Sequence, residues 1–143
     1  MPNWCHFEMR VKGKRKNIEE AWKQIFGLDF DNGGKFLYRV HTDDDTFEFN
    51  ENGIAVIKGY CAWSVRSCMF NGEGTYLESQ KEGAEYRHAT SIDKISEEFA
   101  LDIEICSEEP MMGFIEEYYI SKGEIEYGEC YDIHPSFNFR RFY

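Results

Sequence analysis

A change of hydrophobic period within residues 90–132 constrains the fold of this chain more than any other feature of its sequence. Apolar residues first recur at Ile92, Ile95 and Phe99, which is the spacing of one face of a helix. From Leu101 onward they alternate with polar residues, as is typical of a strand with one buried face. We therefore predict a helix that leads directly into a strand.

Two further alternating runs, rich in aromatic residues, follow at residues 114–120 and 124–131 around a short turn that contains Gly123. This pattern predicts a β-hairpin. On its second strand the side chains are expected to divide between two faces, with Ile125, Tyr127 and Tyr131 on one and Glu124, Glu126 and Asp132 on the other. The hairpin is therefore predicted to present a row of carboxylates beside exposed tyrosines.

The first half of the chain supplies further elements. Residues 4–12 alternate in hydrophobicity and predict a first strand, and residues 53–61 predict a strand that is apolar on both faces. A helix is predicted to begin at Asn17, because Glu20 lies three residues later and completes a capping-box pattern. Residues 36–41 are expected to form a short strand.

The order of these elements (strand, helix, strands, helix, strand) is that of a ferredoxin-like α+β sandwich. We expect a mostly antiparallel sheet with two helices on one face and an added C-terminal hairpin. Residues 71–89 have little apolar period and are expected to form a loop or a short extra strand. At 143 residues the chain is predicted to be a single domain, residues 1–143, with an aromatic and basic tail at residues 135–143.

The acidic residues are concentrated toward the C-terminus. The formal net charge is −11, and residues 91–143 hold 13 of the 27 acidic residues but only 4 of the 16 basic ones. Such a field repels nucleic acid and attracts basic surfaces, so we expect no direct contact with nucleic acid. Solubility alone is the competing interpretation of the same charge.

The cysteines and the polarity of the chain bear on its compartment. Five cysteines are an odd number without paired spacing, and no apolar run approaches the length of a membrane span. The N-terminus is polar and has no signal-peptide pattern. These features predict a cytoplasmic protein with reduced thiols and no membrane contact.

Motifs for cofactors or metals are not found. The aspartates at residues 43–45 lack the spacing of a calcium loop, and the cysteines lack the spacing of a zinc site or an iron–sulfur cluster. Neighbouring acids on a strand, such as Glu116 and Glu117, face opposite ways and do not form a catalytic pair. No cofactor, metal site or catalytic residue is therefore predicted.

Three segments carry a resemblance to a known family. The opening Met-Pro-Asn-Trp-Cys, followed by an alternating strand that ends at Gly13, resembles the start of the YubB-type ferredoxin-like family of uncharacterised phage and plasmid proteins. Residues 90–105 and, more loosely, residues 59–63 are similar to its helix–strand and Cys/Trp-rich segments. The resemblance implies a fold and an origin in a mobile genetic element, and it implies no catalytic residue.

Charge and resemblance together predict a non-enzymatic, acidic binding protein of a phage or mobile element. We expect it to occupy the basic, nucleic-acid-binding surface of a host defence nuclease such as a CRISPR effector, and so to act as an inhibitor of the anti-CRISPR kind. The predicted partner contacts are Glu116, Glu117, Tyr118, Tyr119, Glu124, Glu126 and Glu129.

Two alternatives stay open. The first is an enzyme that pairs a cysteine with a histidine, drawn from Cys61, Cys68, His88 and His134. The second is a self-associating module, such as a homodimer, joined through an open sheet edge or through the aromatic tail.

Overall fold

Seven antiparallel strands form one sheet in the computed structural model, which describes residues 2–44, 46–84 and 86–132. The strand order is β2-β4-β1-β5-β6-β7, and β3 also pairs with β4. The elements in chain order are β1 (Trp4–Lys12), α1 (Arg15–Ile25), β2 (Val40–Thr42), β3 (Glu48–Phe49), β4 (Ala55–Ala62), α2 (Val65–Met69), α3 (Tyr76–Ser79), α4 (Ile92–Phe99), β5 (Asp102–Glu109), β6 (Phe114–Ser121) and β7 (Glu124–Asp132). The α+β class and the antiparallel sheet are thus as predicted.

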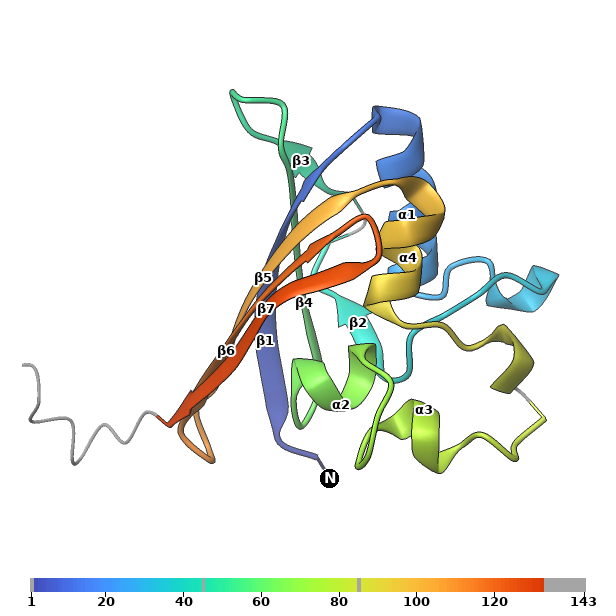
Figure 1. Cartoon of the computed structure of the whole chain (residues 1–143), viewed down its shortest axis with the longest axis vertical. Coiled ribbons are helices and arrows are strands. Elements are labelled where there is room, and N and C mark those ends of the chain that lie inside the picture. Colours follow the sequence, from blue (N-terminus) through green and yellow to red (C-terminus); the bar gives the residue numbers. More distant parts are fainter. Residues whose placement is uncertain (1, 45, 85, 133–143) are drawn as a thin grey trace, which may run out of the picture.

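The two faces of the sheet are in different environments. Figure 1 shows the helices on one side of the sheet, while none of the described helices covers the other side. Along β1 the side chains of Cys5, Phe7 and Met9 are buried toward the helices, whereas His6 and Arg10 are exposed. This alternation follows the period of two in the sequence and leaves an open face of the sheet.

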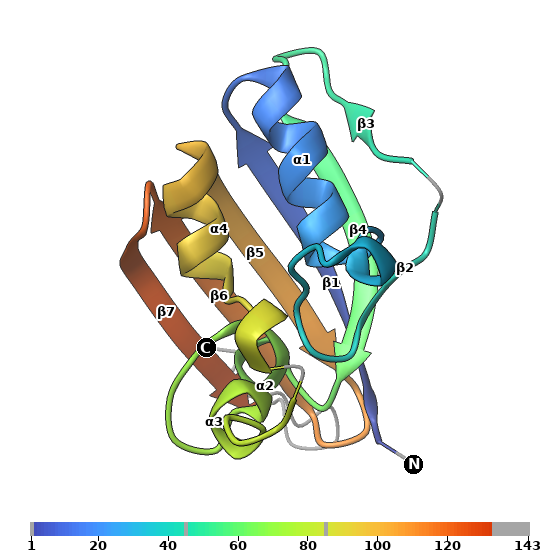
Figure 2. The same cartoon turned by 90° about the vertical axis from the view of Figure 1, so that its right-hand side faces the viewer.

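The helices α1 and α4 lie side by side on the covered face (Figure 2). Each contributes apolar side chains at helical spacing to the core, including Ile18 and Ile25 from α1 and Ile92 and Ile95 from α4. The helix predicted from the period change at residues 90–100 is therefore confirmed.

The predicted start of α1 is wrong. The helix begins at Arg15 after Lys14, and the side chain of Asn17 does not cap it. Instead, the Asn17 amide donates a hydrogen bond to the backbone oxygen of Phe99, 3.1 Å away, at the end of α4. Asn17, the first residue of the capping-box pattern, therefore connects α1 to the end of α4 and does not cap α1.

Two short helices lie where the sequence shows no clear period. Ser64 caps α2 by accepting a hydrogen bond from the Ser67 backbone amide at 3.0 Å, and Thr75 caps α3 by accepting one from the Glu78 amide at 3.3 Å. A helix of one or two turns is too short to display a hydrophobic repeat, which is why residues 71–89 were predicted as a loop or strand.

The hairpin β6–β7 is confirmed, but its second strand is irregular. Tyr119 lies opposite Tyr127 and Ile120 lies opposite Ile125, so Glu126 is an extra residue, a β-bulge. The bulge places Ile125 on the helix side of the sheet and Tyr127 on the open face. The prediction that these two residues share a face is therefore wrong.

The segment before β4 and the C-terminal tail differ in how far they can be compared with the predictions. The predicted strand at residues 36–41 is shifted to Val40–Thr42. The basic, aromatic tail at residues 135–143 lies outside the described residues. Within the described ranges, no helix is both long enough and apolar enough to cross a membrane.

Candidate interaction surface on the open face

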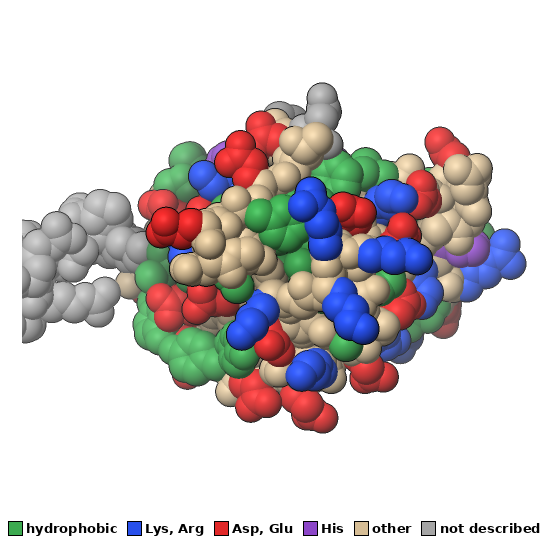
Figure 3. Space-filling model, turned by 90° about the horizontal axis from the view of Figure 1, so that it is seen from above, with side chains coloured by type: hydrophobic (Ala, Val, Ile, Leu, Met, Phe, Trp, Pro, Cys, Tyr) green, Lys and Arg blue, Asp and Glu red, His purple; other side chains and the backbone are tan. Residues whose placement is uncertain are grey.

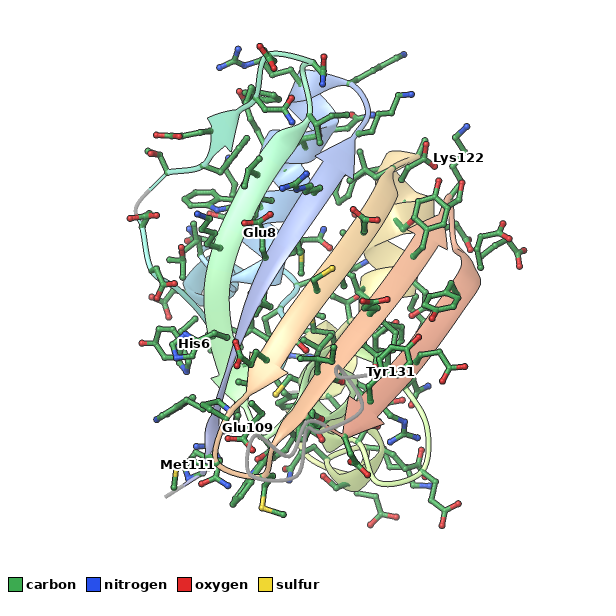
Figure 4. The ribbon with its side chains drawn as sticks, turned by 90° about the vertical axis from the view of Figure 1, so that its left-hand side faces the viewer. His6, Glu8, Glu109, Met111, Lys122 and Tyr131 are labelled. Carbon is green, nitrogen blue, oxygen red and sulfur yellow. The ribbon has the colours of Figure 1, made fainter. Side chains whose placement is uncertain are left out.

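Side chains of three neighbouring strands form an acidic patch on the open face (Figure 4). Residues that pair across an antiparallel sheet point to the same side, so the register of β5, β6 and β7 fixes its membership. We call this patch the acidic face and define it as Glu104, Glu108, Glu117, Tyr119, Tyr127, Glu129 and Tyr131.

The charges at the centre of the acidic face oppose one another. Glu117 of β6 lies directly opposite Glu129 of β7. On the same face, Glu117 also lies opposite Cys106 of the other neighbouring strand, β5. Glu8 of β1 follows in the same row, but it is neutralised by Arg10 at 2.9 Å and by Lys58 at 3.9 Å. Within the described residues, neither Glu117 nor Glu129 forms an ion pair, so their repulsion is uncompensated.

The Cys106 thiol responds to this field. Its partial burial, together with the nearby carboxylates of Glu104, Glu117 and Glu8, raises its pKa above the ordinary value. The thiol therefore stays protonated at neutral pH and is a poor nucleophile.

Three exposed tyrosines flank the carboxylates. Tyr119 and Tyr127 lie opposite each other, and the hydroxyl groups of Tyr127 and Tyr131 share a hydrogen bond. That hydrogen bond, with smaller contributions from desolvation and nearby acids, raises the pKa of Tyr127 to about 12. Exposed tyrosines combine apolar area with a polar hydroxyl group and are common anchors of protein interfaces.

Four of the seven predicted contact residues are exposed on or beside this surface, and the side chain of a fifth, Glu117, is half-buried there. Glu117, Tyr119 and Glu129 belong to the acidic face, Glu124 begins β7, and Glu126 is the bulge residue.

Glu116 and Tyr118 lie on the covered side, so the prediction that their side chains contact a partner is wrong. The side chain of Glu116 is 1% exposed and Tyr118 is also buried. The alternation of β6 points these even-numbered residues toward the helices, while the odd-numbered ones point to the open face. Sequence reasoning assigned neither face of β6 to the core, because both faces carry an acid and a tyrosine.

The buried Glu116 carboxylate joins the sheet to α2. It accepts hydrogen bonds from the backbone amides of Val65 and Arg66, at 2.8 and 3.0 Å, where that helix begins. It also accepts from the hydroxyl groups of Ser107 and Tyr118, at 2.9 and 2.7 Å. Burial and this carboxylate raise the pKa of Tyr118 above its ordinary value.

The acids of β5 were not among the predicted contacts. Glu104 and Glu108 lie opposite Tyr119 and Ile115 of β6 and extend the acidic face by one strand. Their alternation is visible in the sequence, but their position beside the hairpin depends on the pairing of β5 with β6. This pairing could have been predicted, because consecutive strands joined by a short turn usually pair. It would have placed the acids of β5 beside those of the hairpin.

A second cluster on the open face is aromatic. Trp4 lies 5.2 Å from Tyr60 between ring centroids, and His41 lies 5.3 Å from Tyr60, with His6 at the margin. These rings belong to β1, β2 and β4, at some distance along the sheet from the tyrosines of β7. No sequence pattern predicted this cluster, because its members come from three separate strands.

The predicted cysteine–histidine site is not supported by the contacts of its members. Cys61 is buried beside Cys5 and Cys68, and hydrogen bonds with these thiols, followed by burial, raise its pKa. The Cys68 thiol donates to the backbone oxygen of Ala62 at 3.1 Å. His88 accepts a hydrogen bond from the side chain of the adjacent Arg87, and His134 lies outside the described residues.

The His, Cys, Asp and Glu side chains also bear on metal binding. In the part of the chain that the structure describes, no three residues among His, Cys, Asp and Glu converge on a position for a metal ion.

The acidic excess is not uniform over the molecule. Seen from the end where β1 meets α1, the surface carries Lys and Arg side chains among the acids (Figure 3). This end includes the exposed residues Lys12, Lys14, Arg15 and Lys16. This end of the molecule therefore carries both signs of charge.

Comparison with known proteins yields no relative for this chain. No family model matches the sequence, and neither a curated protein nor a solved structure shows significant similarity to it.

Proposed function

We propose that this protein is a non-enzymatic binding protein whose acidic face engages a basic surface of another protein. The observation that carries the proposal is the uncompensated pair of Glu117 and Glu129, directly opposite each other on the face of the sheet that the described helices leave uncovered. Like charges in such a cross-strand pair destabilise a sheet. A basic partner offsets that repulsion, and the exposed tyrosines supply anchors around it.

The proposal extends to the kind of partner. Carboxylates in a row on a rigid sheet resemble the regular negative charge of a nucleic-acid backbone. A protein groove that binds nucleic acid is therefore complementary to this surface, and the attraction accelerates association. We propose that the partner is a host defence nuclease, such as a CRISPR effector, which loses access to its nucleic acid when the groove is occupied.

The proposal also includes a ferredoxin-like framework and an origin in a mobile element. The strand order β2-β4-β1-β5, with α1 after β1 and α4 before β5, supports this framework, to which the hairpin β6–β7 is added. The proposed origin rests on the resemblance of the opening Met-Pro-Asn-Trp-Cys and the strand after it to the YubB-type family.

A charge-reversal experiment tests the function. The double variant Glu117→Lys/Glu129→Lys is compared with the wild type for binding to purified CRISPR effector nucleases, by competition with their nucleic acid. We expect the variant to bind about 100-fold more weakly, because each reversal replaces an attraction with a repulsion.

The matched control carries the same change of charge elsewhere. In Glu51→Lys/Glu82→Lys, both exposed acids lie in loops away from the acidic face. This control is expected to retain binding. Equal losses in the two double variants, or the absence of any competition by the wild type, contradict the proposal.

A further inference from the structure

The strand β7 forms an exposed edge of the sheet. Figure 2 shows it along one margin, and none of the described strands pairs with its outer side. All nine residues of β7 are exposed, and the strand is long for an edge. The free amides and carbonyl groups along such an edge are a template for another extended chain.

A groove of mostly apolar lining, with Asn71 and Glu129 at its margin, lies beside this edge on the helix side. It has a volume of about 370 Å³, and its lining includes Arg66, Phe70, Tyr118 and Ile125. The rings of Phe70 and Tyr118 are 4.7 Å apart, and the side chain of Ile125 remains 52% exposed.

Gly128 of β7 shapes the floor of the groove. It lies opposite Tyr118, and a Cβ atom at this position would lie 3.0 Å from the Tyr118 ring. The glycine therefore allows the ring to pack directly against the backbone of β7. The groove is built into the edge strand rather than lying apart from it.

A strand added to β7 would meet two different surfaces. Its side chains alternate between the faces of the sheet, so that every second one points to the groove and the others point to the acidic face. Apolar side chains fit the first environment and basic side chains fit the second.

We propose that β7 binds an extended segment of the partner, with alternating basic and apolar side chains, as an additional antiparallel or parallel strand. This inference rests on the proposed function, since it names the form in which the basic partner is recognised. A second copy of the chain is a poorer occupant, because two paired β7 strands would bring Glu124, Glu126, Glu129 and Asp132 of each copy together.

The test uses a synthetic nonapeptide of alternating lysine and valine, with phenylalanine as the central apolar residue. Binding to the full chain is measured by fluorescence anisotropy, and amide hydrogen exchange is followed by NMR. We expect the outward-facing amides of β7 to exchange at least about tenfold more slowly with the peptide bound, because they become hydrogen-bonded.

A matched peptide isolates the backbone contribution. It has the same sequence but is N-methylated at alternate residues on the side that would donate to β7. Its charge is unchanged, whereas its strand-pairing donors are removed. We expect it to bind at least about tenfold more weakly, given the contribution of several main-chain hydrogen bonds.

Two variants of the protein distinguish a contribution of the groove to peptide binding from the effect of an added surface charge. Ile125→Lys places a charge at the groove and is expected to weaken the peptide about tenfold or more. Leu28→Lys is the control, because Leu28 is 50% exposed in the segment after α1, away from β7. Thermal unfolding verifies that both variants are folded.

The outcomes separate the inference from the proposed function. Equal binding of the two peptides overturns strand addition, and the charge-reversal experiment on Glu117 and Glu129 then decides the proposed function alone. Loss of effector binding on charge reversal, with no protection of β7, keeps the function and rejects the added strand. Protection of the outer β7 amides without peptide also overturns the inference, because the C-terminal tail or a second copy of the chain would then already occupy the edge. The molecular mass in solution distinguishes the tail from a second copy.

Discussion

At the scale of single residues, Glu116 shows how far position decides the role of a side chain. Glu116 and Glu117 are adjacent in the sequence, yet one is buried in a network of donors and the other is on the open face. The buried carboxylate satisfies two backbone amides of α2 and two hydroxyl groups. Hydrogen bonds to an ionised acceptor are stronger than neutral ones, so this acid serves structure.

Removal of this acceptor is predicted to be strongly destabilising. Glu116→Ala should lower the free energy of unfolding by about 3 kcal/mol, because it leaves buried donors without a partner. Urea denaturation followed by circular dichroism measures the change. Glu117→Ala is the matched control, and we expect it to be neutral or slightly stabilising, since it removes a repulsion across the sheet. Equal effects of the two variants would falsify the assigned role of Glu116.

Tyr118 predicts a dependence of stability on alkaline pH. Burial, and then the Glu116 carboxylate, raise its pKa in the folded state above the ordinary value of 10.0. Above pH 10 the unfolded chain therefore loses this proton while the folded protein retains it, so the free energy of unfolding falls as pH rises. In Tyr118→Phe the decline should be shallower, as measured by urea denaturation between pH 8 and about 11. An identical slope in both proteins contradicts this account.

At the scale of elements, periodic segments were predictable and local turns were not. The alternation in β1 and β5 and the helical spacing in α4 are repeated over several residues, so the burial of one face follows from the sequence. The bulge at Glu126 depends on one unpaired residue, and α2 depends on an acid about 50 positions later in the chain. Neither feature leaves a periodic signal.

The candidate site was predictable to a similar degree. Tyr119 and Glu129 were identified because they belong to an alternating, acidic hairpin. Glu104 was missed, since its place beside Tyr119 arises from the pairing of β5 with β6. The aromatic cluster around Tyr60 joins strands that are distant in sequence, and sequence patterns within one strand do not reveal such contacts.

The end of α4 offers a stabilising substitution. Ala100 follows the helix in the left-handed conformation, with φ of 53°, where a side chain is unfavourable. Ala100→Gly should raise the free energy of unfolding by about 0.5–1 kcal/mol, measured by chemical denaturation. The comparison variant Ala21→Gly lies inside α1 and should be destabilising by about 1 kcal/mol. A loss of stability in Ala100→Gly counts against the strain inferred at this residue.

At the scale of the whole molecule, charge opposes the folded state. The net charge is −11, and the ion pairs found among the described residues are at the surface, where each contributes little. The core formed by the helices and the covered face of the sheet therefore carries most of the stability. The acidic face adds repulsion to a fold that is held together by burial.

The repulsion among the acidic side chains predicts that salt stabilises the folded protein. Raising sodium chloride from about 20 mM to about 500 mM should increase the thermal midpoint, because ions screen the repulsion between carboxylates. The variant Glu129→Lys, in which opposite charges face each other across β6 and β7, should start from a higher midpoint and respond less to salt. Calorimetry at several salt concentrations measures both effects. A midpoint that falls with salt in the wild type argues against repulsion as the dominant surface effect.

The hydrogen bonds between Glu116 and α2 also bear on the evolutionary history of this architecture. Because the acceptor belongs to β6 and the donors to a helix inserted between β4 and α4, the hairpin and the helix depend on each other. They are thus expected to be inherited together. An ancestral form without the hairpin would have lacked α2 as well, or would have supplied another acceptor for its first turn.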